Sequence, residues 1–212
     1  MKEKGFTLVE LLIVLALIAI LAAVLIAVIN PGAIMTRGRD TQRKGDLRNL
    51  AAATDAYIAD IGTGANLQWP ARGYCSSTGP GNFFFSTSTA NTSTFPTGWP
   101  SITTGPYGAT GTNSTAANGN GWVPLNFQAS TIVGLGSLPL DPRNGISGTA
   151  ANGQSVVFVY SFTCDTNFNY EYAAKLEGDA PAMANDGGNR NTCASASVDC
   201  LYEVGPGKAT LY

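Results

Sequence analysis

The chain of 212 residues contains no histidine and few charged residues. Only 12% of its residues are charged, and from Ile61 to Leu140 the single charge is Arg72. The absence of histidine removes the commonest general base and the catalytic triads built on it. The net charge is −2, and no basic run is long enough to indicate a nucleic-acid surface. The composition therefore favours a structural or binding role over catalysis.

The cysteines are few but even in number: Cys75, Cys164, Cys193 and Cys200. They lack paired C-x-x-C spacing, and without histidine a zinc site is not expected. An even number of cysteines beside a membrane or export segment indicates two disulfides in an oxidising compartment. Spacing alone leaves all three possible pairings open.

The sequence does contain one long apolar run, near the N-terminus. Residues 11–29 carry no charge, and as a helix they would span roughly 28 Å, close to the hydrocarbon thickness of a bilayer. Two alternatives stay open, a buried core helix and a cleavable secretory signal. Core helices are rarely apolar all round, and no A-x-A cleavage site lies in or just after this run. We therefore predict a membrane-spanning helix.

Glu10 stands at the start of this apolar run with no Lys or Arg at helical spacing within it. A carboxylate inside a membrane costs roughly 2.5–3.5 kcal/mol on insertion scales, so such a residue needs a partner or stays protonated. The free α-amine of a neighbouring chain would serve if the chain were cut just upstream. A short polar leader ending in Gly5 offers the place for that cut.

The opening "MKEKGFTLVELLIVLALIAIL" resembles the N-terminus of a type IV prepilin or of a type II secretion pseudopilin. The leader, the Gly5–Phe6 junction, the acid and the apolar run all match that pattern. The resemblance implies that a membrane aspartyl peptidase cuts between Gly5 and Phe6 and methylates the amine of Phe6. It also implies that Glu10 pairs with the N-terminus of an adjacent subunit during assembly, which offsets its charge in the polymer.

The residues after the apolar run predict a second, amphipathic helix. Asn30 as a cap and Pro31 at the first helical position would restart a helix after the interruption. We expect this second helix to end at Gly62. Its apolar stripe, spaced i, i+3, i+4, should pack on a sheet; it consists of Leu47, Leu50, Ala51, Thr54, Tyr57, Ile58 and Ile61.

The basic residues at the start of this helix point to the opposite topology. Arg37, Arg39, Arg43, Lys44 and Arg48 follow the apolar run, and the positive-inside rule alone would place them in the cytoplasm. Cleavage of a prepilin-like leader requires a cytoplasmic N-terminus, and we give that more weight. We expect Asp40 and Asp46 to pair with part of the basic group within the helix. The remaining charge would match acidic surfaces on adjacent subunits.

The rest of the chain predicts a head with an antiparallel sheet. Residues 62–130 are rich in turn signals and should hold a few short strands or turns, with Trp69, Trp99 and Trp122 packing on the core. Strands are expected at residues 155–163, 169–176 and 200–204. "LPLDPRNG" reads as a turn before them and also resembles the entry to the sheet of secretion pseudopilins.

These expectations give an α+β, pilin-like fold, with a long N-terminal helix packed on a C-terminal antiparallel sheet. The predicted parts are a leader (1–5), a transmembrane and filament-core helix (6–30), an amphipathic helix (31–61) and an extracytoplasmic head (62–212). The head divides into the long connection (62–130) and the sheet (about 131–212). Many pilins close a C-terminal loop with a disulfide, and by that resemblance we prefer Cys193–Cys200, which leaves Cys75–Cys164.

We expect no cofactor and no metal, with one weak candidate. The segment "GDAPAMANDGGN" holds Asp179 and Asp186 among glycine turns, and oxygen ligands of this kind suit calcium. Secretion major pseudopilins, which the chain resembles, bind calcium in a C-terminal loop. The spacing is not that of an EF-hand, and a turn stabilised by Asn and Asp side chains is the favoured alternative.

The predicted function is that of a non-catalytic filament subunit. The resemblance implies three kinds of partner: copies of the same chain or co-pilins, the prepilin peptidase with the inner-membrane assembly machinery, and membrane lipid before assembly. The protein would cross the inner membrane once and then enter an extracellular pilus or a periplasmic pseudopilus. The alternatives are a type II secretion pseudopilin that drives protein export, and a membrane-anchored extracytoplasmic binding domain or enzyme that is never cleaved.

Overall fold

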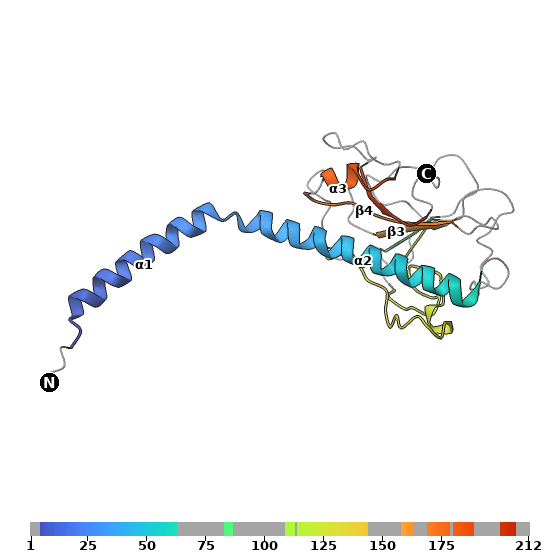
Figure 1. Cartoon of the computed structure of the whole chain (residues 1–212), viewed down its shortest axis with the longest axis horizontal. Helices are drawn as coiled ribbons and strands as arrows, with labels where there is room; N and C mark the ends of the chain where they lie inside the picture. The colour runs from blue at the N-terminus through green and yellow to red at the C-terminus, as the bar shows by residue number, and fades with distance from the viewer. Residues whose placement is uncertain are drawn as a thin grey trace. The chain divides into compact units, whose positions relative to one another are not determined.

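The computed structural model describes residues 5–62, 83–86, 109–112, 114–143, 158–162, 169–178, 180–188 and 200–206. The chain forms two compact units, Met1–Thr36 and Arg37–Tyr212, which are described separately. Figure 1 shows the helical N-terminal part and the mixed C-terminal part in chain order. The α+β class predicted from the sequence, with a long N-terminal apolar helix and a C-terminal sheet, is confirmed.

Helix α1 (Leu8–Val28) is apolar all round after its first turn. Its span Leu8–Ile26 has a mean hydropathy of 3.2 over 19 residues, long and apolar enough to cross a membrane. Among the residues that the structure describes, none of that span is buried. This finding does not support the alternative of a buried core helix, and the membrane-spanning helix stays the prediction.

The break after α1 is where the sequence predicted it. α1 ends when the backbone of Ile29 turns extended, and helix α2 (Pro31–Ile61) begins two residues later. The side-chain oxygen of Asn30 accepts a hydrogen bond from the amide of Ala33 at 3.2 Å, so Asn30 caps α2 with Pro31 in its first turn. α2 stops at Gly62, whose φ of 89° is easy only for glycine.

The sheet has five strands in the order β2-β1-β3-β4-β5. The strands are β1 (Phe83–Ser86), β2 (Ala109–Thr112), β3 (Phe158–Phe162), β4 (Tyr170–Ala174) and β5 (Tyr202–Val204). The three strands predicted near the C-terminus correspond to β3, β4 and β5, with shorter bounds. β1 and β2 come from the long connection and pair in parallel, so the sheet is not antiparallel throughout. Residues 87–108 between them are long enough for the crossover that a parallel pair needs.

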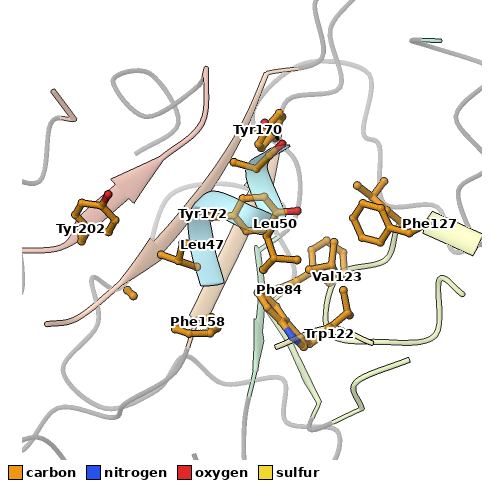
Figure 2. Close-up of a cluster of buried hydrophobic side chains, with 14 of the residues drawn as sticks. Leu47, Leu50, Phe84, Trp122, Val123, Phe127, Phe158, Tyr170, Tyr172 and Tyr202 are labelled. Atoms are coloured by element: carbon orange, nitrogen blue, oxygen red, sulfur yellow. Dashed lines mark hydrogen bonds between the residues drawn. The ribbon is translucent and has the colours of Figure 1, made fainter. Parts of the chain in front are cut away.

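α2 contributes its predicted apolar stripe to the core. Figure 2 shows Leu47 and Leu50 among the rings of Phe84, Phe158 and Tyr172, and all five residues are buried. Two hydrogen bonds fix α2 against β4: the Tyr172 hydroxyl lies 2.7 Å from that of Thr54, and the Tyr170 hydroxyl donates to the carbonyl of Ala51 at 2.9 Å. Ile58 and Ile61, at the end of the stripe, are half-buried.

Residues 114–143 fold onto this core with little regular structure. Their one helical turn is the 3-10 helix η2 (Phe127–Ala129). Trp122 is fully buried, its Nε1 donates to the carbonyl of Pro139 at 2.8 Å, and its ring meets Phe158 and Tyr172 at centroid distances of 6.0 and 6.3 Å. The packing predicted for Trp122 is therefore confirmed. Trp69 and Trp99 lie outside the described residues.

Candidate functional site

The N-terminal end of α1 carries the residues predicted for processing and assembly. Thr7 is the N-cap of α1, and its hydroxyl accepts a hydrogen bond from the Glu10 amide at 3.3 Å. In return Glu10 Oε2 accepts from the Thr7 amide at 2.9 Å and from the Thr7 hydroxyl at 2.7 Å. This reciprocal pair is a capping box, which satisfies donors at the helix start that would otherwise lack partners.

The capping box gives Glu10 a partner that the sequence reasoning missed. The sequence analysis expected the Glu10 carboxylate to pair with an amine of another chain or to stay protonated, but its Thr7 donors lie within the same chain. The signal was present as "TLVE", a T-x-x-E pattern before an apolar run. Both contacts use Oε2, and no donor among the described residues contacts Oε1. The second oxygen thus remains available for an amine from outside the chain.

The predicted cleavage junction is accessible. Phe6 is 79% exposed, and a side chain added at Gly5 would meet nothing within 4 Å. Both residues precede the first turn of α1, where the backbone is not yet helical. An exposed peptide bond outside a helix is the form that a peptidase can bind. Residues 1–4 of the leader lie outside the described residues.

Two of the five basic residues at the start of α2, Arg39 and Arg43, are neutralised inside the C-terminal unit. Arg43 is fully buried and holds Asp141 with two hydrogen bonds, Nε to Oδ2 at 2.6 Å and Nη2 to Oδ1 at 2.9 Å. Its other contacts are Asp40 Oδ1 at 2.8 Å and Glu177 Oε1 at 2.8 Å. Burial alone would lower the pKa of the Arg43 guanidinium, but the hydrogen bonds to Asp141 and Glu177 outweigh burial and raise it.

Two further arginines complete the cluster around Glu177. Arg39 donates to both oxygens of Glu177 at 2.8 and 2.6 Å, and Arg143 lies 3.5 Å from Oε2. Three arginines thus face three carboxylates, a set that we name the Arg43 cluster (Arg39, Asp40, Arg43, Asp141, Arg143, Glu177). The prediction of pairing within the helix is confirmed for Asp40, whereas Asp46 has no ion pair among the described residues and its side-chain hydrogen-bond partner is Gln42. The conflict with the positive-inside rule is reduced, because Arg39 and Arg43 are neutralised by head residues and do not act as loop charges.

The Arg43 cluster predicts a loss of stability in acid. Hydrogen bonds from Arg39 and then Arg43 lower the pKa of Glu177 from 4.5 to about 2. A lowered carboxylate pKa stabilises the fold above pH 4.5, and this contribution is lost as the pH falls toward 2. The shift corresponds to about 3 kcal/mol before solvent screening of this partly exposed group, which reduces it. Denaturant unfolding in detergent micelles should therefore show falling stability from pH 4.5 to 2 and a smaller fall for Glu177→Gln. Equal slopes for both proteins would contradict the assignment.

The weak calcium candidate has a structural explanation at its one described residue. Asp186 Oδ1 accepts from the amide of Gly188 at 2.8 Å, and Oδ2 accepts from the amide of Glu203 at 2.6 Å. Asp186 thus closes a turn and fastens it to β5, as the favoured alternative proposed. No group of three metal-binding side chains occurs among the described residues. Asp179 lies outside them.

The disulfide pairing stays a prediction. Cys200 is disulfide-bonded and buried, beside the sulfur of Met183 at 3.7 Å. The other cysteines, Cys75, Cys164 and Cys193, lie outside the described residues. Cys193–Cys200 and Cys75–Cys164 therefore remain the preferred pairs.

The described N-terminus defines a class of protein, one with a single exposed apolar helix that starts in an acid-bearing capping box. Residues 1–26 match the family model for the prokaryotic N-terminal methylation motif. This motif is the prepilin signature of type IV pilins and pseudopilins, so the resemblance found in the sequence is confirmed. It implies processing by prepilin peptidase and assembly into filaments. No curated protein and no solved structure matches the chain.

Proposed function

We propose that the chain is a prepilin whose mature form is a non-catalytic structural subunit of a type IV pilus-like filament. The observation that carries this proposal is the methylation motif at residues 1–26, on a helix whose apolar span is unburied among the described residues. An exposed apolar helix of this length needs either lipid or copies of itself around it. Lipid would cover it before assembly, and neighbouring helices would cover it in the filament.

The proposal assigns a role to each residue at the N-terminus. The peptidase cuts between Gly5 and Phe6 and methylates the new amine of Phe6. Oε1 of Glu10 then receives the α-amine of an adjacent subunit, while Thr7 holds Oε2 and orients the carboxylate. Residues 6–30 form the filament core, residues 31–61 carry the head, and residues 62–212 form the extracytoplasmic head.

The alternative is a type II secretion pseudopilin, and one turn favours it. The "LPLDP" segment resembles the entry to the sheet of that group, and its Asp141 is the main carboxylate partner of buried Arg43. The turn is closed by the Arg143 amide, which donates to Asp141 Oδ1 at 2.9 Å. Surface filaments on the producing strain would favour a pilus, and a short periplasmic filament would favour the pseudopilin.

Intact mass tests the proposal directly. The membrane-extracted protein, co-expressed with a prepilin peptidase, should lose residues 1–5 and gain one methyl group. Gly5→Val is the matched control and should stay at full mass, because it changes the residue at the proposed cut. Gly5 has open space around it, so the change leaves the fold intact. An unchanged wild-type mass, with a peptidase active on a control prepilin, would leave a membrane-anchored binding domain as the function.

A further inference from the structure

Arg48 differs from the arginines of the Arg43 cluster. It is exposed, its Nε donates to the Tyr202 hydroxyl at 2.9 Å, and its guanidinium carbon lies 5.8 Å from the centre of the Tyr202 ring. These contacts hold the side chain in one place. Within the described residues no carboxylate lies at ion-pair distance from Arg48, whereas Arg39, Arg43 and Arg143 each have one.

The space beside Arg48 is open. A polar pocket with a volume of about 450 Å³ lies between α2 and β5, and its lining includes the cations Lys44 and Arg48 and the acids Asp186 and Glu203. The oxygens of Asp186 accept backbone amides, and Glu203 is buried. Lys44 is half-buried, so Arg48 is the exposed charge of this wall. With its Nε donating to Tyr202, the positioned guanidinium of Arg48 can still donate two parallel hydrogen bonds from its Nη atoms to a carboxylate.

The same exposed face of α2 carries an acid one heptad further on. Asp55 is exposed; its Oδ1 accepts the Tyr170 hydroxyl at 2.6 Å, and no donor among the described residues contacts its Oδ2. Seven residues of helix separate Arg48 and Asp55 by about 10.5 Å, too far for an ion pair within one chain. The exposed residue between them, Ala52, is short and leaves room for another helix.

We infer that Arg48 of one subunit binds Asp55 of a second copy of this chain, displaced by seven residues along a parallel α2. The inference rests on the proposed filament and names one of its subunit contacts. All copies that are anchored by the same N-terminal helix enter the membrane in one direction, so their α2 helices run parallel. Each copy offers one Arg48 and one Asp55, so the contact is head-to-tail and repeats without closing. Charge complementarity of this kind sets the register between the copies.

A charge swap tests the contact in the producing strain. Arg48→Glu and Asp55→Arg should each lower the filament yield at least about tenfold, because each brings like charges together at every repeat. The double variant R48E/D55R should recover most of the yield. Asn49→Glu is the matched control, since Asn49 is exposed on the same helix but lies about 100° around it from Arg48, and its yield should stay near wild type.

Cysteine cross-linking provides a second readout that does not depend on yield. Subunits with Arg48→Cys and Asp55→Cys, carrying different tags and expressed together, should form a mixed disulfide dimer in filaments. Pairing Arg48→Cys with Ile132→Cys, on an exposed loop, should not. If wild-type subunits are cleaved and form filaments while the single variants assemble normally and the cross-link is absent, the contact is wrong and the filament proposal stands. Uncleaved wild-type protein would overturn both.

Discussion

Replacing Arg43 with alanine should lower the free energy of unfolding by about 3–5 kcal/mol, because it removes the cation from three acids at once. Asp40, Asp141 and Glu177 all contact Arg43, and their side chains are at most 10% exposed. Asp40 has further donors in the amides of Glu177 and Gly178, both at 2.8 Å, but Asp141 loses its two strongest hydrogen bonds. In a chain of this size such a loss corresponds to a fall in melting temperature of about 6–20 °C.

The measurement is denaturant unfolding of the full-length protein in detergent micelles, followed by tryptophan fluorescence. Arg43→Lys keeps the charge but loses the planar fork that holds Asp141, so it should fall between wild type and alanine. Arg48→Ala is the control on the exposed face and should change the free energy of unfolding by less than about 1 kcal/mol. An unchanged midpoint for Arg43→Ala would show that the Arg43 cluster contributes no stability.

The Arg43 cluster also marks where sequence reasoning reached its limit. The apolar stripe of α2 was predicted correctly at Leu47, Leu50 and Tyr57, because helical periodicity is a local property. The same periodicity continues backward through Arg43 and Asp40, both buried. A cation and an acid at two core positions of one stripe signalled a buried ion pair that must be completed from elsewhere.

The missing partner could not be found in the same way. Glu177 stands 134 residues after Arg43 in the chain, directly beyond β4, and nothing in its local sequence separates it from an ordinary surface acid. Pairing of distant segments depends on topology, which a single sequence does not contain. The parallel pairing of β1 and β2 was missed for the same reason, since the long connection predicted strands but not their direction.

The N-terminal site was the opposite case, since nearly all of its information is local. The Gly5–Phe6 junction, the cap at Asn30 and the end of α2 at Gly62 each depend on a few consecutive residues. The partner of Glu10 was missed only because a counter-charge was sought, where a hydroxyl and an amide three residues away satisfy the carboxylate. Capping energetics therefore explain how Glu10 is held before any second subunit arrives.

Trp122→Ala should lower the free energy of unfolding by about 3–5 kcal/mol and loosen residues 114–143 from the sheet. Trp122 is fully buried where residues 114–143 meet the strands, and its loss leaves a cavity beside Phe158 and Tyr172. The loss also removes the only donor that the Pro139 carbonyl has among the described residues. Hydrogen exchange should therefore speed up most for the amides of Trp122 and Leu138, which donate to Ser114 and Thr115 at 3.0 and 2.7 Å.

Ile132→Ala is the matched control for this change, because Ile132 belongs to the same segment but is 61% exposed. Its truncation should leave both the unfolding midpoint and the exchange of residues 114–143 near wild type. If Trp122→Ala accelerates exchange equally in β3 and β4, residues 114–143 and the sheet unfold as one unit. If exchange rises only in residues 114–143, this segment is a separately cooperative layer. The Trp122 ring holds it to the sheet, and the Asp60 contacts with Ser130 and Thr131 hold it to α2.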